Sequence, residues 1–296
     1  MSEAPLVTVV IPTYNRRDCL GRAIDSVLRQ DCGPVELIVV DDASQDGTAK
    51  WVAAAYPHIK LIRNPINRGV SASRNAGLAA GGGQFIAFLD DDDWWDESFL
   101  RRHLDLLASR PDAVLSHCDY TSVAPDGGSP KTRNSREVGS DPVKTFLMEN
   151  PIQSMTLVVM RRQALAEVRG FREDYLMCED RELYLRILRQ GAFVHEPRPL
   201  AYKTRSADGA TLNLARWAAG AQTLLDDFFS REESRPYRHM EKQARARWQT
   251  RLALICLRRA GSRFLGLRLA ASALRLDALG SARYVANRLR LETFGR

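Results

Sequence analysis

The sequence has no long hydrophobic run. Although 45% of its 296 residues are hydrophobic, no apolar stretch approaches the roughly 18–20 residues that a membrane-spanning helix requires. Near the start, the chain carries Glu3 where a secretory signal would carry positive charge, and the apolar run that follows is short. We therefore expect no membrane span and no export, and we place the protein in the cytoplasm.

Cysteine is scarce and forms no pattern. The five cysteines are odd in number and widely spaced, and the sequence contains no CxxC pair and no Cys/His cluster. A disulfide framework and a structural zinc site are therefore unsupported, and the cysteines fit a reducing compartment.

Several signatures of well-known enzyme classes are missing. No GxGxxG follows the first predicted strand and no GxxxxGK[ST] occurs, which disfavours dinucleotide-dependent redox enzymes and P-loop NTPases. The HExxH of zinc proteases and the GxSxG of serine hydrolases are also absent.

Charge is distributed unevenly along the chain. The net charge is +7, but residues 210–296 hold 17 Lys/Arg against 7 Asp/Glu, a net of +10, which leaves −3 for residues 1–209. A basic region of this kind suits anionic lipid headgroups, nucleic acid or a phosphorylated acceptor. The alternative is a helical surface that arginine merely keeps in solution.

The order of hydrophobic patterns predicts an α/β fold. Short β-branched runs such as Leu6–Ile11 are typical of buried strands, and amphipathic stretches such as Cys19–Gln30 have the period of helices. Because the two patterns alternate through the first 120 residues, we predict a mainly parallel, Rossmann-like sheet flanked by helices.

The second half of the chain is less regular. Pro125–Pro142 is rich in Gly, Pro and Ser, which predicts a mobile loop. From about Thr211 the pattern is helical only. We therefore predict a catalytic domain over residues 1–209 and a basic helical appendage over residues 210–296.

Polar residues follow three of the predicted strands. Pro12–Asn15 follow the first, Asp41 and Asp42 the second, and Asp90–Asp93 the strand Gln84–Leu89. In doubly wound sheets, ligands bind beyond the carboxyl ends of the strands. Helix capping explains single Asp or Ser residues at such places, but not four successive aspartates.

The four aspartates predict a metal. Two unit charges about 4 Å apart interact by about 4 kcal/mol at an effective dielectric constant near 20, so adjacent carboxylates need a cation or free solvent. Mg²⁺ commonly bridges one or two carboxylates to substrate phosphates. Because the run has the wrong sign to bind phosphate directly, we expect Mg²⁺ or Mn²⁺ beside it.

Five segments together resemble the inverting family 2 glycosyltransferases, which have a GT-A fold. The segments span roughly residues 5–205 and occur in the order of that family. They are VVIPTYNR (Val9–Arg16), ELIVVDDASQDGT (Glu36–Thr48), NRGVSASRNAGL (Asn67–Leu78), FLDDDDWW (Phe88–Trp95) and GFREDYLMCEDRELYLRILRQG (Gly170–Gly191).

The resemblance implies a site for a nucleotide-sugar donor. Pro12, Thr13 and Tyr14 would line the nucleobase pocket, and Asp42 would accept hydrogen bonds from a uracil or thymine ring. The full set of residues implied to bind the donor is Pro12, Thr13, Tyr14, Asn15, Asp42, Arg68, Arg74, Asp90 and Asp91. For Arg74, a helix-surface position is an equal alternative.

The same resemblance implies the metal ligand and the catalytic base. Asp90–Asp92 would form the DxD element, with Asp91 near the ribose, Asp92 as the direct metal ligand, and a register that is open by one residue. Asp180 would act as the general base that deprotonates the acceptor hydroxyl. Capping of a helix N-terminus is compatible with that role, because it fixes the direction of the carboxylate.

Two departures from the family narrow the prediction. Gln243–Trp248 reads QARARW rather than the QxxRW of membrane-embedded synthases, which disfavours a processive enzyme. The segment after Leu200 lacks the histidine that some relatives place near the metal, and His195 is a candidate substitute, although a lone histidine is more often structural.

The sequence therefore predicts a hexosyltransferase of polysaccharide biosynthesis. It would move one sugar from a UDP- or dTDP-sugar to a glycan or lipid-linked acceptor, with peripheral membrane contact through the basic helices and no nucleic-acid partner. A nucleotidyltransferase is the alternative enzyme, although VVIPTYNRR lacks the glycine-rich loop of that class. A non-catalytic nucleotide-sugar-binding protein is the third hypothesis.

Overall fold

The computed structural model describes residues 5–124, 129–135, 138–205 and 213–294 of the chain. Contacts divide the chain into two compact units. Unit 1 comprises residues 1–140, 151–175 and 179–209, and unit 2 comprises residues 141–150, 176–178 and 210–296. The functional division at residue 210 stays a prediction.

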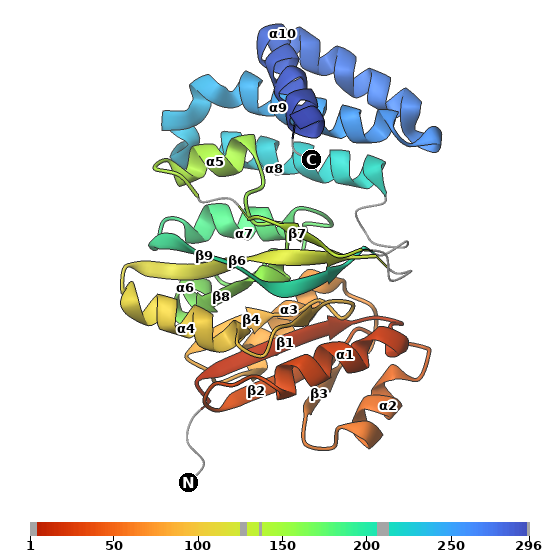
Figure 1. Cartoon of the computed structure of the whole chain (residues 1–296), viewed down its shortest axis with the longest axis vertical. Helices are drawn as coiled ribbons and strands as arrows, with labels where there is room; N and C mark the ends of the chain where they lie inside the picture. The colour runs from red at the N-terminus through yellow and green to blue at the C-terminus, as the bar shows by residue number, and fades with distance from the viewer. Residues whose placement is uncertain (1–4, 125–128, 136–137, 206–212, 295–296) are drawn as a thin grey trace. The chain divides into compact units, whose positions relative to one another are not determined.

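Unit 1 is built on a nine-stranded mixed sheet with the strand order β3-β2-β1-β4-β8-β6-β9-β5, in which β7 pairs with β6 (Figure 1). The strands are β1 (Val7–Thr13), β2 (Val35–Asp41), β3 (Lys60–Arg63), β4 (Phe85–Phe88), β5 (Trp94–Trp95), β6 (Ala113–Val123), β7 (Lys131–Arg133), β8 (Val158–Arg161) and β9 (Ala192–Thr204). The first four strands are parallel, as predicted. Beyond them, β8 runs antiparallel between β4 and β6, and β9 returns parallel to β6.

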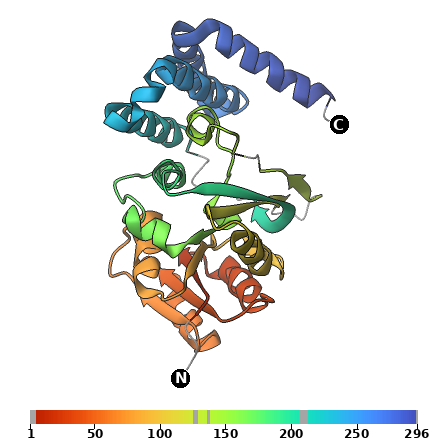
Figure 2. The same cartoon turned by 90° about the vertical axis from the view of Figure 1, so that its left-hand side faces the viewer.

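Helices cover both sides of this sheet (Figure 2). They are α1 (Arg17–Leu28), α2 (Thr48–Ala55), α3 (Val70–Ala80), α4 (Phe99–Ser109), α6 (Arg162–Glu167) and α7 (Glu179–Ile187). The whole of β1 is buried, which makes it the centre of the core. Helix α3 packs closely on β1 because it carries Gly77, where an added Cβ would lie 2.3 Å from Cγ1 of Val10.

Three strands of unit 1 were not predicted, namely the two-residue β5, β7 and β9. β7 lies within the segment Pro125–Pro142, predicted as a mobile loop, of which residues 125–128 and 136–137 fall outside the described residues. β9 was missed because Glu196-Pro197-Arg198-Pro199 interrupts its hydrophobic pattern, and the register of β9 with β6 is irregular close to that interruption.

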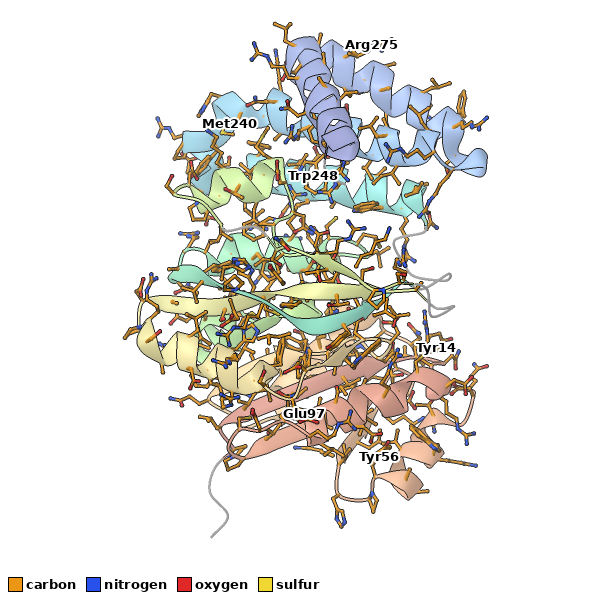
Figure 3. All side chains as sticks on the ribbon, in the orientation of Figure 1. Tyr14, Tyr56, Glu97, Met240, Trp248 and Arg275 are labelled. Atoms are coloured by element: carbon orange, nitrogen blue, oxygen red, sulfur yellow. The ribbon has the colours of Figure 1, made fainter. Side chains whose placement is uncertain are left out.

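Unit 2 is helical. Its helices are α5 (Pro142–Met148), α8 (Leu214–Ser230), α9 (Glu241–Leu257) and α10 (Arg263–Phe294), with 3-10 turns at Glu232–Met240 and Ala260–Ser262. Trp248, labelled in Figure 3, is 3% exposed and belongs to an apolar cluster with Leu147 and Leu225, and its indole Nε1 donates to the carbonyl of Leu147 at 2.7 Å. Within the described residues, no helix combines the length and the apolar character needed to cross a membrane.

Candidate functional site

The four aspartates Asp90–Asp93, which we call the acidic turn, connect β4 to β5. Leu89 continues the pairing of β4 by donating from its amide to the carbonyl of Val10 at 3.0 Å. The chain then turns, and the amide of Asp93 donates to the carbonyl of Asp90 at 3.1 Å. This turn brings Asp90 and Asp93 within ion-pair distance of the same lysine, Lys203.

Protein cations neutralise the first and last aspartates. Nζ of Lys203, from the end of β9, lies 2.5 Å from Oδ2 of Asp93 and 3.7 Å from Oδ2 of Asp90. Nη2 of Arg74 lies 2.9 Å from Oδ1 of Asp90. The hydroxyl of Ser154 donates to Asp90 and that of Thr156 to Asp93. Burial by itself would lower the pKa of Lys203, but attraction to these two carboxylates outweighs burial and raises it.

Asp91 and Asp92, the middle pair of the acidic turn, have little positive charge close to them. Among the described residues, the only ion pair that involves Asp91 or Asp92 joins Asp92 to Arg16 at 3.6 Å. Burial raises the pKa of Asp91 to about 7. A contact with Thr13 lowers this pKa, but it offsets only part of the effect of burial. Burial and repulsion from Asp90 also raise the pKa of Asp92. Two partly buried carboxylates with so little positive charge beside them are suited to receive a cation.

The donor chemistry of this pair fits Mg²⁺ or Mn²⁺. Both ions prefer oxygen ligands, and Mg²⁺ sites often use only one or two carboxylates together with substrate phosphates. The described residues contain no group of three or more His, Cys, Asp or Glu side chains arranged to hold a metal. A metal held by this pair would complete its coordination with oxygens of the substrate or of water.

Arg74 joins the acidic turn to the start of α7. Its guanidinium is buried, and while Nη2 contacts Asp90, Nη1 contacts Oε1 of Glu179 at 3.0 Å. The next residue, Asp180, accepts a hydrogen bond from the amide of Arg181 at 2.7 Å. Burial, reinforced by repulsion from Glu179, raises the pKa of Asp180 to about 7. A carboxylate with a pKa near neutrality is suited to general-base catalysis.

Asp42 lies at the end of β2 and is saturated with protein donors. Its carboxylate accepts from Nδ2 of Asn64 at 2.7 Å, from the amide of Arg68 at 3.0 Å and from the amide of Gly69 at 2.8 Å. Gly69 has a φ of 87°, a conformation that favours glycine, and it leads into α3. Asp42 therefore anchors the segment before α3, which limits the directions left for a ligand.

The chain reaches solvent directly after β1. Pro12 and Thr13, the last two residues of β1, are buried, whereas Tyr14, labelled in Figure 3, is 43% exposed. Asn15 has a φ of 51°, and its amide donates to Oγ of Ser44 at 2.9 Å, which ties the end of β1 to the end of β2. These groups line the same edge of the sheet as Asp42, because β1 and β2 are parallel and in register.

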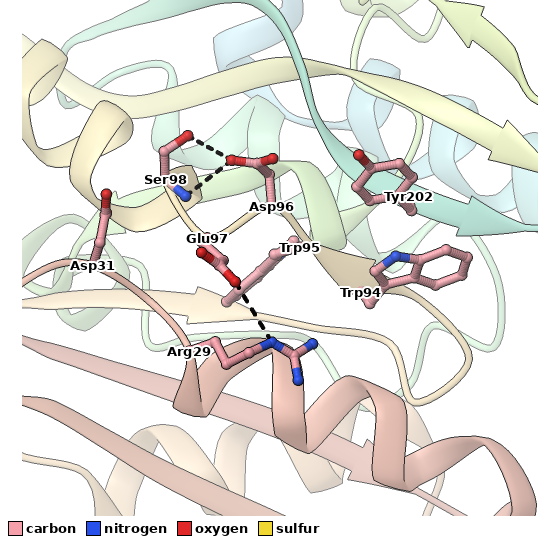
Figure 4. A pocket seen from close by; sticks show the side chains of 8 residues that line it. All are labelled: Arg29, Asp31, Trp94, Trp95, Asp96, Glu97, Ser98 and Tyr202. Atoms are coloured by element: carbon pink, nitrogen blue, oxygen red, sulfur yellow. Dashed lines mark hydrogen bonds and ion pairs between the residues drawn. The ribbon is translucent and has the colours of Figure 1, made fainter.

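A separate hollow of about 480 Å³ lies between the end of α1 and the start of α4 (Figure 4). It is lined by Arg29, Asp31, Trp94, Trp95, Asp96, Glu97, Ser98 and Tyr202. Asp96 accepts from the hydroxyl of Ser98 at 2.6 Å, and Glu97 lies 3.9 Å from Arg29. None of the residues predicted for catalysis or donor binding lines this hollow.

The comparison with protein families decides the class. The model described as "Glycosyl transferase family 2" matches residues 8–169, which is more than half of the chain and includes the acidic turn. The chain belongs to this family.

Two relatives illustrate the sequence similarity of this glycosyltransferase. It is 38% identical over 148 residues to the succinoglycan biosynthesis protein ExoO of Rhizobium meliloti (strain 1021), covering 49% of this chain and 42% of that protein. It is 37% identical over 103 residues to the UDP-Glc:alpha-D-GlcNAc-diphosphoundecaprenol beta-1,3-glucosyltransferase WfgD of Escherichia coli, covering 34% of this chain and 41% of that protein. The matches span less than half the length of these two relatives.

Solved structures confirm the GT-A fold. The mannosyltransferase PcManGT of Pyrobaculum calidifontis, in complex with GDP-Man and Mn²⁺, superposes with a TM-score of 0.63 at 22% identity over 98% of this chain and 81% of that one. TarS residues 1–349 of S. aureus, in complex with UDP-GlcNAc, also gives 0.63, at 16% identity over 95% of this chain and 92% of that one. The predicted α/β fold with a helical C-terminal region is therefore confirmed.

Within this glycosyltransferase, the predicted site residues fall into two groups. Asp90, Arg74 and the start of α7 are joined directly through ion pairs. Arg68 instead forms an ion pair with Glu173 at 2.8 Å, on the exposed side of the segment before α3. The individual roles of these residues stay predictions, but the chain does bring the acidic turn and the segment of Asp180 together.

Sequence reasoning missed the cation at the acidic turn. His195 is the candidate for a histidine near the metal, but its Nε2 lies 2.8 Å from Oδ1 of Asp119, and its ring stacks on that of His117. Lys203 occupies the acidic turn instead. A lysine in an unpredicted strand gave no signal in the sequence, since only the pairing of β9 with β6 and β5 places it there.

Proposed function

We propose that this protein is an inverting glycosyltransferase. It transfers one hexose from a UDP- or dTDP-sugar to a hydroxyl group of a cell-surface glycan or lipid-linked acceptor. The observation that carries the proposal is the arrangement around Arg74, whose guanidinium contacts Asp90 of the acidic turn and Glu179, the neighbour of Asp180. A base for the acceptor and carboxylates for a donor-bound metal therefore belong to one site.

The donor class is supported from two directions. The structural neighbours are complexes with GDP-Man and with UDP-GlcNAc, and the name of WfgD specifies a UDP-glucose donor and a diphosphoundecaprenol-linked acceptor. In this chain, Pro12, Thr13, Tyr14 and Asn15 would surround the nucleobase, and Asp42 would face its edge. ExoO and WfgD together support an acceptor from polysaccharide biosynthesis.

Asp92, with Asp91 beside it, would hold a divalent metal. When bound, Mg²⁺ or Mn²⁺ would neutralise the charge of the donor diphosphate. The distribution of charge in the acidic turn fits this role, because Lys203 and Arg74 already neutralise Asp93 and Asp90. The presence of Mn²⁺ in the PcManGT complex supports the same assignment.

The chemistry is a single in-line displacement. The acceptor oxygen forms a bond to the anomeric carbon as Asp180 removes the hydroxyl proton, and the bond from that carbon to the diphosphate oxygen breaks with its electron pair. The nucleoside diphosphate leaves, and configuration at the anomeric carbon inverts. Arg74 positions the site, since its contacts hold the acidic turn against the N-terminus of α7.

A donor titration tests the proposal. Calorimetry with UDP-, dTDP- and GDP-sugars, with and without Mn²⁺, should show metal-dependent binding of one donor. Asp92→Asn should abolish the metal dependence, and Asp105→Asn, at an exposed position on α4, should leave it intact. Binding of no nucleotide sugar under any condition would end the proposal.

The other hypotheses predict different results. A nucleotidyltransferase would bind a nucleoside triphosphate more tightly than a nucleotide sugar. A non-catalytic binding protein would bind the donor, but it would release no nucleoside diphosphate with any acceptor or with water. Family membership and the raised pKa of Asp180 favour transfer. Cytoplasmic location and contact of the basic helices with a membrane stay predictions.

A further inference from the structure

Helix α10 of unit 2 exposes several of its large apolar residues. Phe264 is 76% exposed, Leu267 61% and Leu274 53%. Their spacing of three and seven residues places them on one side of the helix. The helix breaks at Asp277, whose φ of −156° is not helical, so this side belongs to the segment before the break (Figure 2).

The opposite side of the same segment is packed and carries both small residues and leucines. Ala273 is 1% exposed, and an added Cβ at Gly266 would lie 2.9 Å from Leu257, at the end of α9. Leu269 packs against the apolar cluster around Trp248. An ordinary surface helix turns its large apolar residues inward. Because this part of α10 turns Phe264, Leu267 and Leu274 outward as well, its outward side is suited to contact with something else.

Arginines flank this apolar stripe. Arg263, Arg268 and Arg275 are exposed and alternate with the apolar residues, and Arg275 is labelled in Figure 3. We call these three arginines together with Phe264, Leu267 and Leu274 the outer face. From Lys242 to Leu276 the sequence holds nine basic residues and no acidic one. Among the described residues, none of the three arginines forms an ion pair.

We propose that the outer face docks on an anionic lipid surface. An apolar stripe bordered by arginine is the pattern of helices that lie in a bilayer interface, with the apolar side chains among the acyl chains and the cations at the phosphates. Charge complementarity favours this occupant over a second copy of the same face, because two such faces would bring six arginines together without a carboxylate.

The experiment is flotation of the full chain with vesicles. Phosphatidylcholine vesicles that contain phosphatidylglycerol should bind the protein at low salt, and phosphatidylcholine alone should bind it weakly. Each arginine near an anionic surface contributes about 1 kcal/mol, or about fivefold in partitioning, so converting all three to Gln should weaken binding by roughly two orders of magnitude. High salt should weaken the electrostatic contribution of these arginines to vesicle binding.

Matched variants distinguish binding through the outer face from a general effect of net charge or of exposed apolar side chains. Arg110, Arg189 and Arg198 are exposed residues of unit 1, and their triple Gln variant loses the same net charge, so it should bind like the wild type. Leu267→Gln should weaken binding about tenfold. Leu28→Gln, at a leucine that is 57% exposed on α1, should not weaken it. Gln favours helix, so these changes preserve α10.

Three results would overturn the proposal. The first is absence of binding to phosphatidylglycerol vesicles at low salt, and the second is equal loss of binding in the face and control variants. The third is a change in oligomeric state, measured by light scattering, when the outer face is altered while vesicle binding is unchanged, which would identify a second copy as the occupant. Transfer to a soluble acceptor should be unaffected in every variant, so failure here is distinguishable from failure of the proposed transferase activity.

Discussion

Replacing Asp180 with Asn should abolish transfer and at the same time stabilise unit 1. Loss of a general base costs about 10²–10⁴ in rate. The stability effect follows from burial, which raises the pKa of Asp180 from 3.8 to about 7, so the fold favours the protonated form. For a carboxylate of this kind, the wild type loses free energy of unfolding as pH rises from about 4 to about 7, whereas a neutral Asn loses none.

The size of this effect can be worked out from the shift. A change of about 3 pH units, from 3.8 to about 7, corresponds to about 4 kcal/mol. Because Asp180 is only partly buried, solvent screens it, and we expect roughly half of that value above pH 7. For a unit of this length, about 2 kcal/mol corresponds to an increase in Tm of about 4–8 °C.

Two measurements decide the outcome. Transfer is followed by release of nucleoside diphosphate, and thermal unfolding is recorded at pH 4.5 and at pH 8. The gain in Tm should appear at pH 8 and vanish at pH 4.5. Asp174→Asn is the control, because this side chain is 63% exposed and Arg172 lowers its pKa, so no gain is expected. Full transfer by Asp180→Asn would refute the role of the base, and an equal Tm at both pH values would refute the argument from burial.

Three further predictions concern the same site. Glu179→Gln should move the acidic limb of the pH profile of kcat/KM below its position near pH 7, because it removes the charge that repels Asp180; a limb that stays in place would contradict this coupling. Lys203→Met should lower the free energy of unfolding in urea by about 3–5 kcal/mol, since Asp93 is 1% exposed and would lose its partner, and adding Asp93→Asn should restore more than half of the loss. Asp92→Asn should leave Tm unchanged or slightly higher while it removes Mn²⁺-dependent donor binding, and a large drop in Tm would show that this carboxylate is structural.

The sequence was most informative where local pattern and buried strands coincide. The run from β1 to β4 could be predicted because β-branched strands alternate with amphipathic helices, and parallel βαβ units leave little choice of topology. β9 could not be predicted, because Pro197 and Pro199 interrupt its pattern and its stability comes from pairing with β6. The strand propensity of individual residues is a weak guide where pairing with a distant strand determines whether a segment forms a strand.

The amino-acid sequence by itself indicated the class of this protein, because five segments that resemble one family occur in the order of that family. It also marked the acidic turn, because four successive aspartates after a buried strand have few structural explanations. Only the tertiary structure decided how those aspartates differ. Asp90 and Asp93 form close ion pairs with Arg74 and Lys203, whereas Asp92, for which we propose a metal, has only the more distant Arg16. The physical reason is that the pKa of a carboxyl depends on burial and on charges within a few ångströms, and Lys203 reaches Asp93 from 110 residues away along the chain.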